Sequence, residues 1–163
     1  MAVALTYEPI ATQTLGSAAA SVTFSSISGA YTDLVLVGSL NTTAALDYWF
    51  RLNGDTGTNH SNTRMTGNGT SGTSSRGSGS SQTYINSIAN ATGQHQFTIN
   101  LLNYSNTTTY KTQLTRFANA GMDSNARVSL WRSTSAITTI LIQTDSSTFT
   151  AGSTFTLYGI AAA

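Results

Sequence analysis

Apolar and aromatic side chains recur at every second position along much of this chain. In the stretch 94–102 they are His95, Phe97, Ile99 and Leu101, with polar residues between them. Successive side chains of a β-strand point to opposite faces, so this spacing predicts a strand with one buried face. The spacing of an amphipathic helix does not recur. The alternation therefore predicts an all-β chain.

Similar patterns, bounded by turn residues, predict about eight strands. Besides 94–102, the predicted strands are 21–24, 31–40, 46–52, 110–118, 126–133, 137–143 and 154–160. Turns are predicted at Asn53-Gly54-Asp55, at Gly121 and at Ala151-Gly152. The one proline, Pro9, lies near the start, where an edge strand tolerates it. Strands of this length and spacing predict an antiparallel β-sandwich, jelly-roll-like, that forms a single domain over residues 1–163.

Two segments depart from the alternation. Residues 66–82 are rich in glycine and serine, a composition typical of a flexible segment, and we predict one long loop there. Residues 1–6 precede the predicted strands and form a predicted N-terminal arm. We expect both segments to reach neighbouring molecules.

The chain carries unusually little charge. Only 8% of its residues are charged, against about 25% in a typical soluble domain. The net charge of +1 is too balanced for a nucleic-acid-binding surface. No apolar run approaches the roughly 20 residues that a membrane-spanning helix needs. We therefore expect protein partners, and neither nucleic acid nor membrane.

The edges of the predicted sheets lack their usual protection. Soluble β-proteins commonly place lysine on edge strands to prevent pairing with other chains. This sequence has a single lysine, Lys111. We expect its edges to be covered in an assembly.

The residues available for catalysis are few. The chain has no cysteine and one glutamate, Glu8, and its five aspartates are far apart in sequence. His95 is expected to be a hydrogen-bonded core histidine, and His60 to lie in a solvated loop. Neither is predicted to belong to a metal or catalytic site. The sequence therefore predicts neither an enzyme nor a cofactor.

Two tryptophans stand near arginines in the predicted strands. Trp49 is close to Arg51, and Trp131 adjoins Arg132. Each tryptophan can cover a sheet face, anchor a protein interface, where Trp and Arg are enriched, or stack on a sugar ring. Arg64 and Arg76 flank or occupy the glycine-rich segment. The candidate interface residues are Met1, Val3, Leu5, Trp49, Arg51, Arg64, Arg76, Trp131 and Arg132.

Two regions of the chain resemble a known family. The N-terminal region 7–40, YEPIATQTLGSAAASVTFSSISGAYTDLVLVGSL, is similar to the start of small structural proteins of tailed bacteriophages, especially of cyanophages and marine phages. The C-terminal region 129–160, which ends in GSTFTLYGI, resembles the end of the same proteins. The resemblance implies a virion component with a β-sandwich fold, and it carries no catalytic residues over to this chain.

These observations lead to one main hypothesis. The chain is expected to be a capsid decoration (cement) protein that binds the major capsid protein and itself, as a homotrimer. It would lie on the capsid exterior of the virion, after assembly in the host cytoplasm. Two alternatives remain open: a tail-fibre or receptor-binding module, and a lectin-like, carbohydrate-binding β-sandwich.

Overall fold

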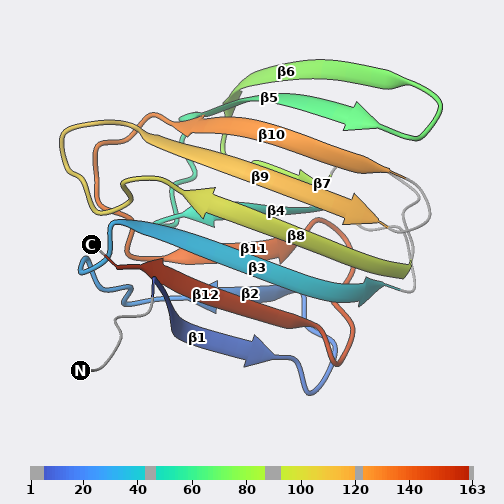
Figure 1. The fold of residues 1–163 in the computed structure, drawn as a ribbon, viewed down its shortest axis with the longest axis horizontal. Coiled ribbons are helices and arrows are strands. Elements are labelled where there is room, and N and C mark those ends of the chain that lie inside the picture. The colour runs from blue at the N-terminus through green and yellow to red at the C-terminus, as the bar shows by residue number, and fades with distance from the viewer. Residues whose placement is uncertain (1–5, 43–46, 87–92, 120–122, 162–163) are drawn as a thin grey trace.

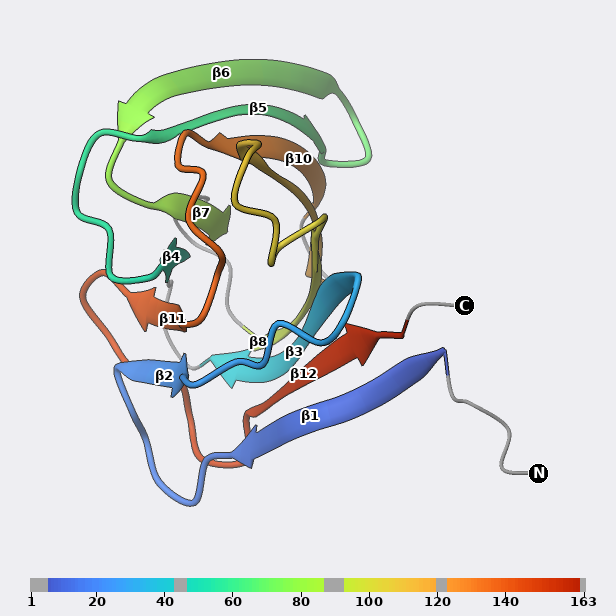
Figure 2. The same cartoon turned by 90° about the vertical axis from the view of Figure 1, so that its left-hand side faces the viewer.

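The computed structural model describes residues 6–42, 47–86, 93–119 and 123–161. These residues form twelve strands and no helix, arranged in two antiparallel sheets. Figure 2 shows the larger sheet curling around the smaller one, which gives the larger sheet a convex outer face. The predicted all-β sandwich is confirmed, with twelve strands in the described part of the chain where about eight were predicted.

The eight-stranded sheet, in front in Figure 1, has the order β1-β12-β3-β8-β9-β10-β5-β6. In that order its strands span Tyr7–Thr14, Thr154–Ile160, Asp33–Thr42, Gly93–Leu101, Lys111–Asn119, Ser124–Trp131, His60–Gly67 and Gly72–Ser80. The four-stranded sheet has the order β2-β11-β4-β7 and spans Ser21–Phe24, Ile140–Thr144, Tyr48–Leu52 and Thr83–Asn86. The closing strand β12 is an interior strand, paired with β1 on one side and β3 on the other.

The hydrophobic core fills the space between the two sheets. Tyr48 of β4 is fully buried there, with ring centroids 5.9 Å from Phe97 and 5.8 Å from Phe149. Its hydroxyl oxygen lies 3.5 Å from Nδ1 of His95. His95 and the alternate residues that follow it on β8 are buried, as the spacing predicts. The expectation of a core histidine at this position is confirmed.

The glycine- and serine-rich segment is not one long loop, so that prediction is wrong. Most of it belongs to a hairpin in which β5 pairs with β6 from His60 to Gly67. In the turn, Oδ1 of Asn68 accepts hydrogen bonds from the backbone N–H groups of Thr70 and Ser71, at 3.0 and 2.8 Å. Gly69 has φ of +82°, which suits the first central position of a type II′ turn. The pair Asn68-Gly69 therefore marks the turn of a hairpin, although the glycine- and serine-rich composition of the segment predicted a loop.

Two glycines allow aromatic rings to lie against the larger sheet. A Cβ built at Gly38 would stand 2.1 Å from the ring of Phe97, its cross-strand partner on β8. A Cβ at Gly159 would stand 2.3 Å from the ring of Tyr31. Real Cβ atoms do not approach other atoms so closely, so both rings depend on the absence of a side chain at these positions.

We predict that Gly38→Ala lowers the free energy of unfolding by about 1–3 kcal/mol, because the core must shift to admit the new methyl group. The matched control is Gly67→Ala on β5, where a new Cβ meets nothing within 4 Å and φ is not positive. The control is expected to change stability by less than about 0.5 kcal/mol. Urea unfolding of both variants checks this, and equal losses would contradict the packing argument.

Candidate protein-binding surface

Three neighbouring strands of the larger sheet, β5, β9 and β10, direct several polar side chains inward and several apolar side chains outward. On β10, Asn125, Arg127 and Ser129 are buried, whereas Val128 is exposed. The buried polar residues of β9 are Lys111, Gln113, Thr115 and Asn119. The interior is therefore mainly apolar beside β12, β3 and β8, whereas beside β9 and β10 buried polar side chains accompany the buried rings of Phe117 and Trp131.

The outward side chains of these strands form a compact block on the convex face. Val128 of β10 stands opposite Thr63 of β5 and Leu114 of β9 in the strand register. In the adjacent row, Ala126 stands opposite Met65 and Arg116. We call these six residues the convex patch: Thr63, Met65, Leu114, Arg116, Ala126 and Val128. Its most exposed apolar members are Met65, at 63%, and Val128, at 54%.

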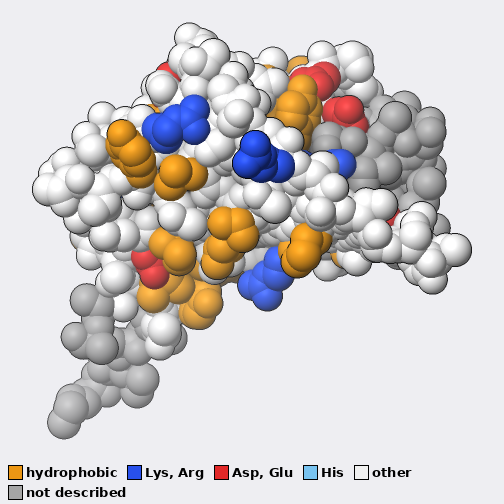
Figure 3. All heavy atoms as spheres, turned by 90° about the horizontal axis from the view of Figure 1, so that it is seen from above, with side chains coloured by type: hydrophobic (Ala, Val, Ile, Leu, Met, Phe, Trp, Pro, Cys, Tyr) orange, Lys and Arg blue, Asp and Glu red, His pale blue; other side chains and the backbone are white. Residues whose placement is uncertain are grey.

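Shallow hollows cross the convex patch. One of about 530 Å³ is lined by Met65, Leu114 and Val128 among others. A second, of about 450 Å³, lies between Val128 and Arg76 of β6. None of the described residues that line either hollow is acidic. Figure 3, seen from the β6 side, shows a surface of mainly uncharged polar groups with separate apolar and basic side chains and a few acidic ones. Such a surface can bind a protein without neutralising many charges.

The inner side of the larger sheet holds two arginines on adjacent strands. Arg64 of β5 stands opposite Arg127 of β10 in register. Burial, and to a smaller extent the charge of Arg64, lower the pKa of Arg127 to about 10. Burial raises the pKa of Asp47, while Arg64 opposes that increase. Arg64 therefore faces the inner side of the sheet with Arg127, not the convex face.

Trp49 is covered by its own chain. It lies on the outer face of the four-stranded sheet but is only 5% exposed. Its Nε1 donates to Oδ1 of Asp145 at 2.5 Å, and the guanidinium carbon of Arg51 lies 4.5 Å from the ring centroid. The hydroxyl of Tyr84 donates to the other oxygen of Asp145 at 3.1 Å. This arrangement fits the interpretation that Trp49 covers a sheet face.

Trp131 is buried at the end of β10, beside the loop that precedes β5. Its Nε1 donates to Oδ2 of Asp55 at 2.6 Å, and its ring stacks on His60 with centroids 6.4 Å apart. Hydrogen bonds from Trp131 and Asn59 are the main causes that lower the pKa of Asp55. Arg132 donates to the backbone oxygen of Thr58 at 2.8 Å. Asp55 thus fastens its loop to the sheet.

His60 does not lie in a solvated loop, so that expectation is wrong. It begins β5, is fully buried, and its Nδ1 lies 3.1 Å from the hydroxyl of Thr83. Burial is the main cause that lowers its pKa to about 4. The ring is therefore neutral at pH 7. The position at the start of a strand opposite Trp131 explains the burial.

The structure separates the residues that the sequence proposed as one interface. Arg76 lies on the convex side of the β6 edge, Arg64 faces the interior, and Arg51 covers Trp49. Trp131 and Arg132 hold the loop at Asp55. Met1, Val3 and Leu5 lie outside the described residues, so an interface role for the N-terminal arm stays a prediction.

Sequence reasoning missed the convex patch because it assigned no inward face to the predicted strands 110–118 and 126–133, and predicted no strand over residues 60–67, where β5 lies. A strand with alternating Val128 and Leu130 is expected to bury those residues, yet here the polar set between them is buried. A signal was present in β8, whose inward side is strongly apolar. The register from β8 through β9 to β10 then fixes Leu114 and Val128 on the outer face.

The fold defined by these two sheets is a β-sandwich. Two solved structures align with the chain. An exo-inulinase from Aspergillus awamori aligns with a TM-score of 0.51 at 11% identity, over 94% of this chain and 29% of the inulinase. The chain thus spans less than a third of that enzyme. The galectin LEC-6 from Caenorhabditis elegans aligns with a TM-score of 0.40 at 8% identity, over 93% of this chain and 96% of the galectin. At 11% identity, the alignment with the inulinase indicates a shared fold and nothing more.

No family model matches the chain, and no curated protein matches it in sequence. Within the described residues, no helix is long and apolar enough to cross a membrane. The same residues contain no group of three or more His, Cys, Asp or Glu side chains placed to hold a metal ion.

We predict that the free energy of unfolding decreases as the pH falls from about 6.5 to 4. The pKa of His60 is about 4 in the folded chain, below the value of 6.5 expected when unfolded. In this window the unfolded state binds a proton that the folded state does not, so acid favours unfolding. The loss reaches at most about 3 kcal/mol for a shift of this size.

Urea unfolding between pH 4 and pH 7 measures this dependence. The control is His60→Gln, which removes the titrating ring and leaves the aspartates of the protein in place. The difference in stability between the two proteins should vary with pH across the window. A constant difference would show that His60 does not titrate as described.

Proposed function

We propose that this chain is a structural protein of a bacteriophage particle, which binds the outside of the capsid and stabilises it as a decoration protein. The observation that carries this proposal is the convex patch, an exposed apolar and hydroxyl surface with one arginine and no acid. Exposed apolar patches of this kind commonly mark protein-binding surfaces. The resemblance of residues 7–40 and 129–160 to small phage structural proteins supplies the class of particle.

The chemistry of the patch suits attachment to a large, regular protein surface. Val128, Leu114 and Met65 offer apolar area, and each stands on a different strand of a rigid sheet. A rigid binding surface loses little conformational entropy when it docks. Modest contacts, repeated over many copies, can then hold capsid subunits together by avidity. A homotrimer bound to the major capsid protein on the virion exterior would provide such repetition.

The two tryptophans do not support the carbohydrate-binding alternative. Stacking on a sugar needs an indole face that is open to solvent. The ring of Trp49 is covered by Arg51, and the ring of Trp131 is stacked on His60. The convex patch, in contrast, has apolar side chains that are already exposed.

We predict that adding this protein to phage heads assembled without it raises the temperature at which the heads release DNA. Val128→Asp should weaken binding to the heads at least about tenfold, because it places an unpaired charge in the apolar centre of the patch. The matched control is Thr23→Asp, another exposed strand position, on the outer face of the four-stranded sheet. The control should bind and protect like the wild type.

Co-sedimentation with the heads gives the affinity, and thermal unfolding shows that each variant folds. Heads that gain no heat resistance from the wild-type protein would contradict the proposal. Particles that lack the protein, keep full heat resistance and fail to adsorb to cells would assign it to the tail fibre instead.

A further inference from the structure

Three of the four described sheet edges are closed to strand pairing. On β1 the register shifts between Pro9 and Ala11. The N–H of Ala161 donates a hydrogen bond to the backbone oxygen of Thr6, so Thr6 directs its backbone groups toward β12. Because residues of a strand direct these groups alternately to its two sides, the backbone of Pro9 faces the outer edge, where proline has no N–H. A bulge and an outward proline are common ways in which natural proteins block an edge strand.

The edges of the smaller sheet are closed in other ways. β2 has four residues, and the side-chain amide of Gln13 donates to the backbone oxygen of Thr23 at 2.7 Å. β7 also has four residues, and its pairing with β4 is irregular between Tyr48 and Trp49. Neither strand offers a long, regular row of free backbone groups.

The edge strand β6 is different. It runs for nine residues, GTSSRGSGS, without proline, and its register with β5 is unbroken from Gly72 to Ser78. The N–H of Asn68 donates a hydrogen bond to the backbone oxygen of Ser71, so Ser71 directs its backbone groups toward the neighbouring strand. Because these groups alternate between the two sides of a strand, the N–H and C=O groups of Gly72, Ser74 and Arg76 face outward. The strand is exposed along most of its length. The chain's one lysine cannot protect this edge, because Lys111 is buried on β9.

We propose that β6 adds a further strand to the sheet by pairing with an extended segment of the capsid protein that carries a carboxylate opposite Arg76. This inference rests on the proposed function and names how that partner is held. Backbone pairing at an exposed sheet edge is a general mode of peptide recognition. Small side chains beside the outward groups, among them Gly72 with open space around its Cα, let another backbone approach.

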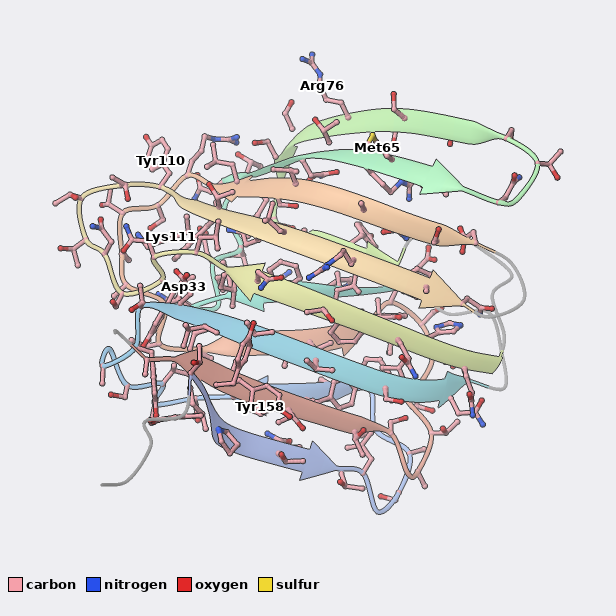
Figure 4. The ribbon with its side chains drawn as sticks, viewed as in Figure 1. Asp33, Met65, Arg76, Tyr110, Lys111 and Tyr158 are labelled. Carbon is pink, nitrogen blue, oxygen red and sulfur yellow. The ribbon has the colours of Figure 1, made fainter. Side chains whose placement is uncertain are left out.

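Charge determines the chemistry of the partner segment. Figure 4 shows Arg76 projecting beyond the β6 ribbon, away from the sheet. It borders the hollow that leads to Val128, and no described residue that lines this hollow is acidic. An opposite charge directly across a strand pair is favourable, whereas a like charge is unfavourable. A carboxylate on the added strand would therefore pair with Arg76 on the convex face.

A second copy of this chain fits the edge less well. Antiparallel pairing of two β6 strands over all nine residues places Arg76 opposite Arg76 of the other copy. The two like charges would face each other on the same side of the sheet. Strand β6 itself contains no acidic residue to relieve the repulsion. A different protein that supplies the carboxylate is the better occupant.

Substitutions at Ser74 separate the backbone from the side chain. Ser74→Pro removes an outward N–H and should fold normally, because edge strands tolerate proline where the N–H faces solvent. We expect it to bind phage heads assembled without this protein at least about tenfold more weakly than the wild type. Ser74→Ala keeps the N–H and should bind like the wild type. Arg76→Glu should bind more weakly than Arg76→Gln.

Hydrogen exchange of the head-bound protein should show protection of the Ser74 and Arg76 amides. If the wild type binds heads while these amides stay unprotected and Ser74→Pro binds equally well, the inference is wrong and the proposed function stands. If the wild type does not bind heads, both are wrong. Equal binding by Arg76→Glu and Arg76→Gln would show that the partner segment carries no carboxylate opposite Arg76. A dimer of the isolated protein that Ser74→Pro abolishes would assign the edge to a second copy.

Discussion

The burial of polar side chains on β9 and β10 is the constraint on which the surface of this protein depends. Because side chains alternate across a strand, burying Asn125, Arg127 and Ser129 obliges Ala126, Val128 and Leu130 to face outward. The same alternation on β9 exposes Leu114. The convex patch therefore lies on the same strands as the buried polar side chains, on their outer face. A change in which residues of these strands face inward would also change which residues form the patch.

An interior with buried polar side chains gives up stability that an apolar one would provide. Burying Val128 in place of a polar neighbour would contribute roughly 1.5–3 kcal/mol of transfer free energy. Among the described residues, the side-chain amide of Asn125 and the hydroxyl of Ser129 have no hydrogen-bond partner. Groups of this kind cost about 1–3 kcal/mol each when buried. The stability of the fold must then come mainly from the apolar core around Tyr48, and from anchors such as the bond between Trp131 and Asp55.

The sequence predicted the apolar part of the interior well, and the part with buried polar side chains poorly, for a physical reason. Where alternation and polarity agree, as on β8 and β12, the strands and their buried faces follow directly from the residues. Where they disagree, the inward face depends on the register with a neighbouring strand, which a single strand's pattern does not contain. Strand β6 has almost no apolar residues at all, so only the turn at Asn68-Gly69 marked its hairpin. The convex patch was missed because the inward faces of β9 and β10 depend on their register with neighbouring strands. The open edge was missed because β6 has almost no apolar residues.

The convex patch and the open edge lie together at one end of the larger sheet. Strand β6 adjoins β5, which adjoins β10, so Arg76 stands directly across from Thr63 of the patch. The opposite end of the sheet is closed at β1 by Pro9 and a bulge. A partner that pairs with β6 would therefore extend the sheet on the side where apolar residues are already exposed. The molecule thus offers one end for binding, and its other end resists continued pairing, which would favour attachment to a surface over growth into a fibre.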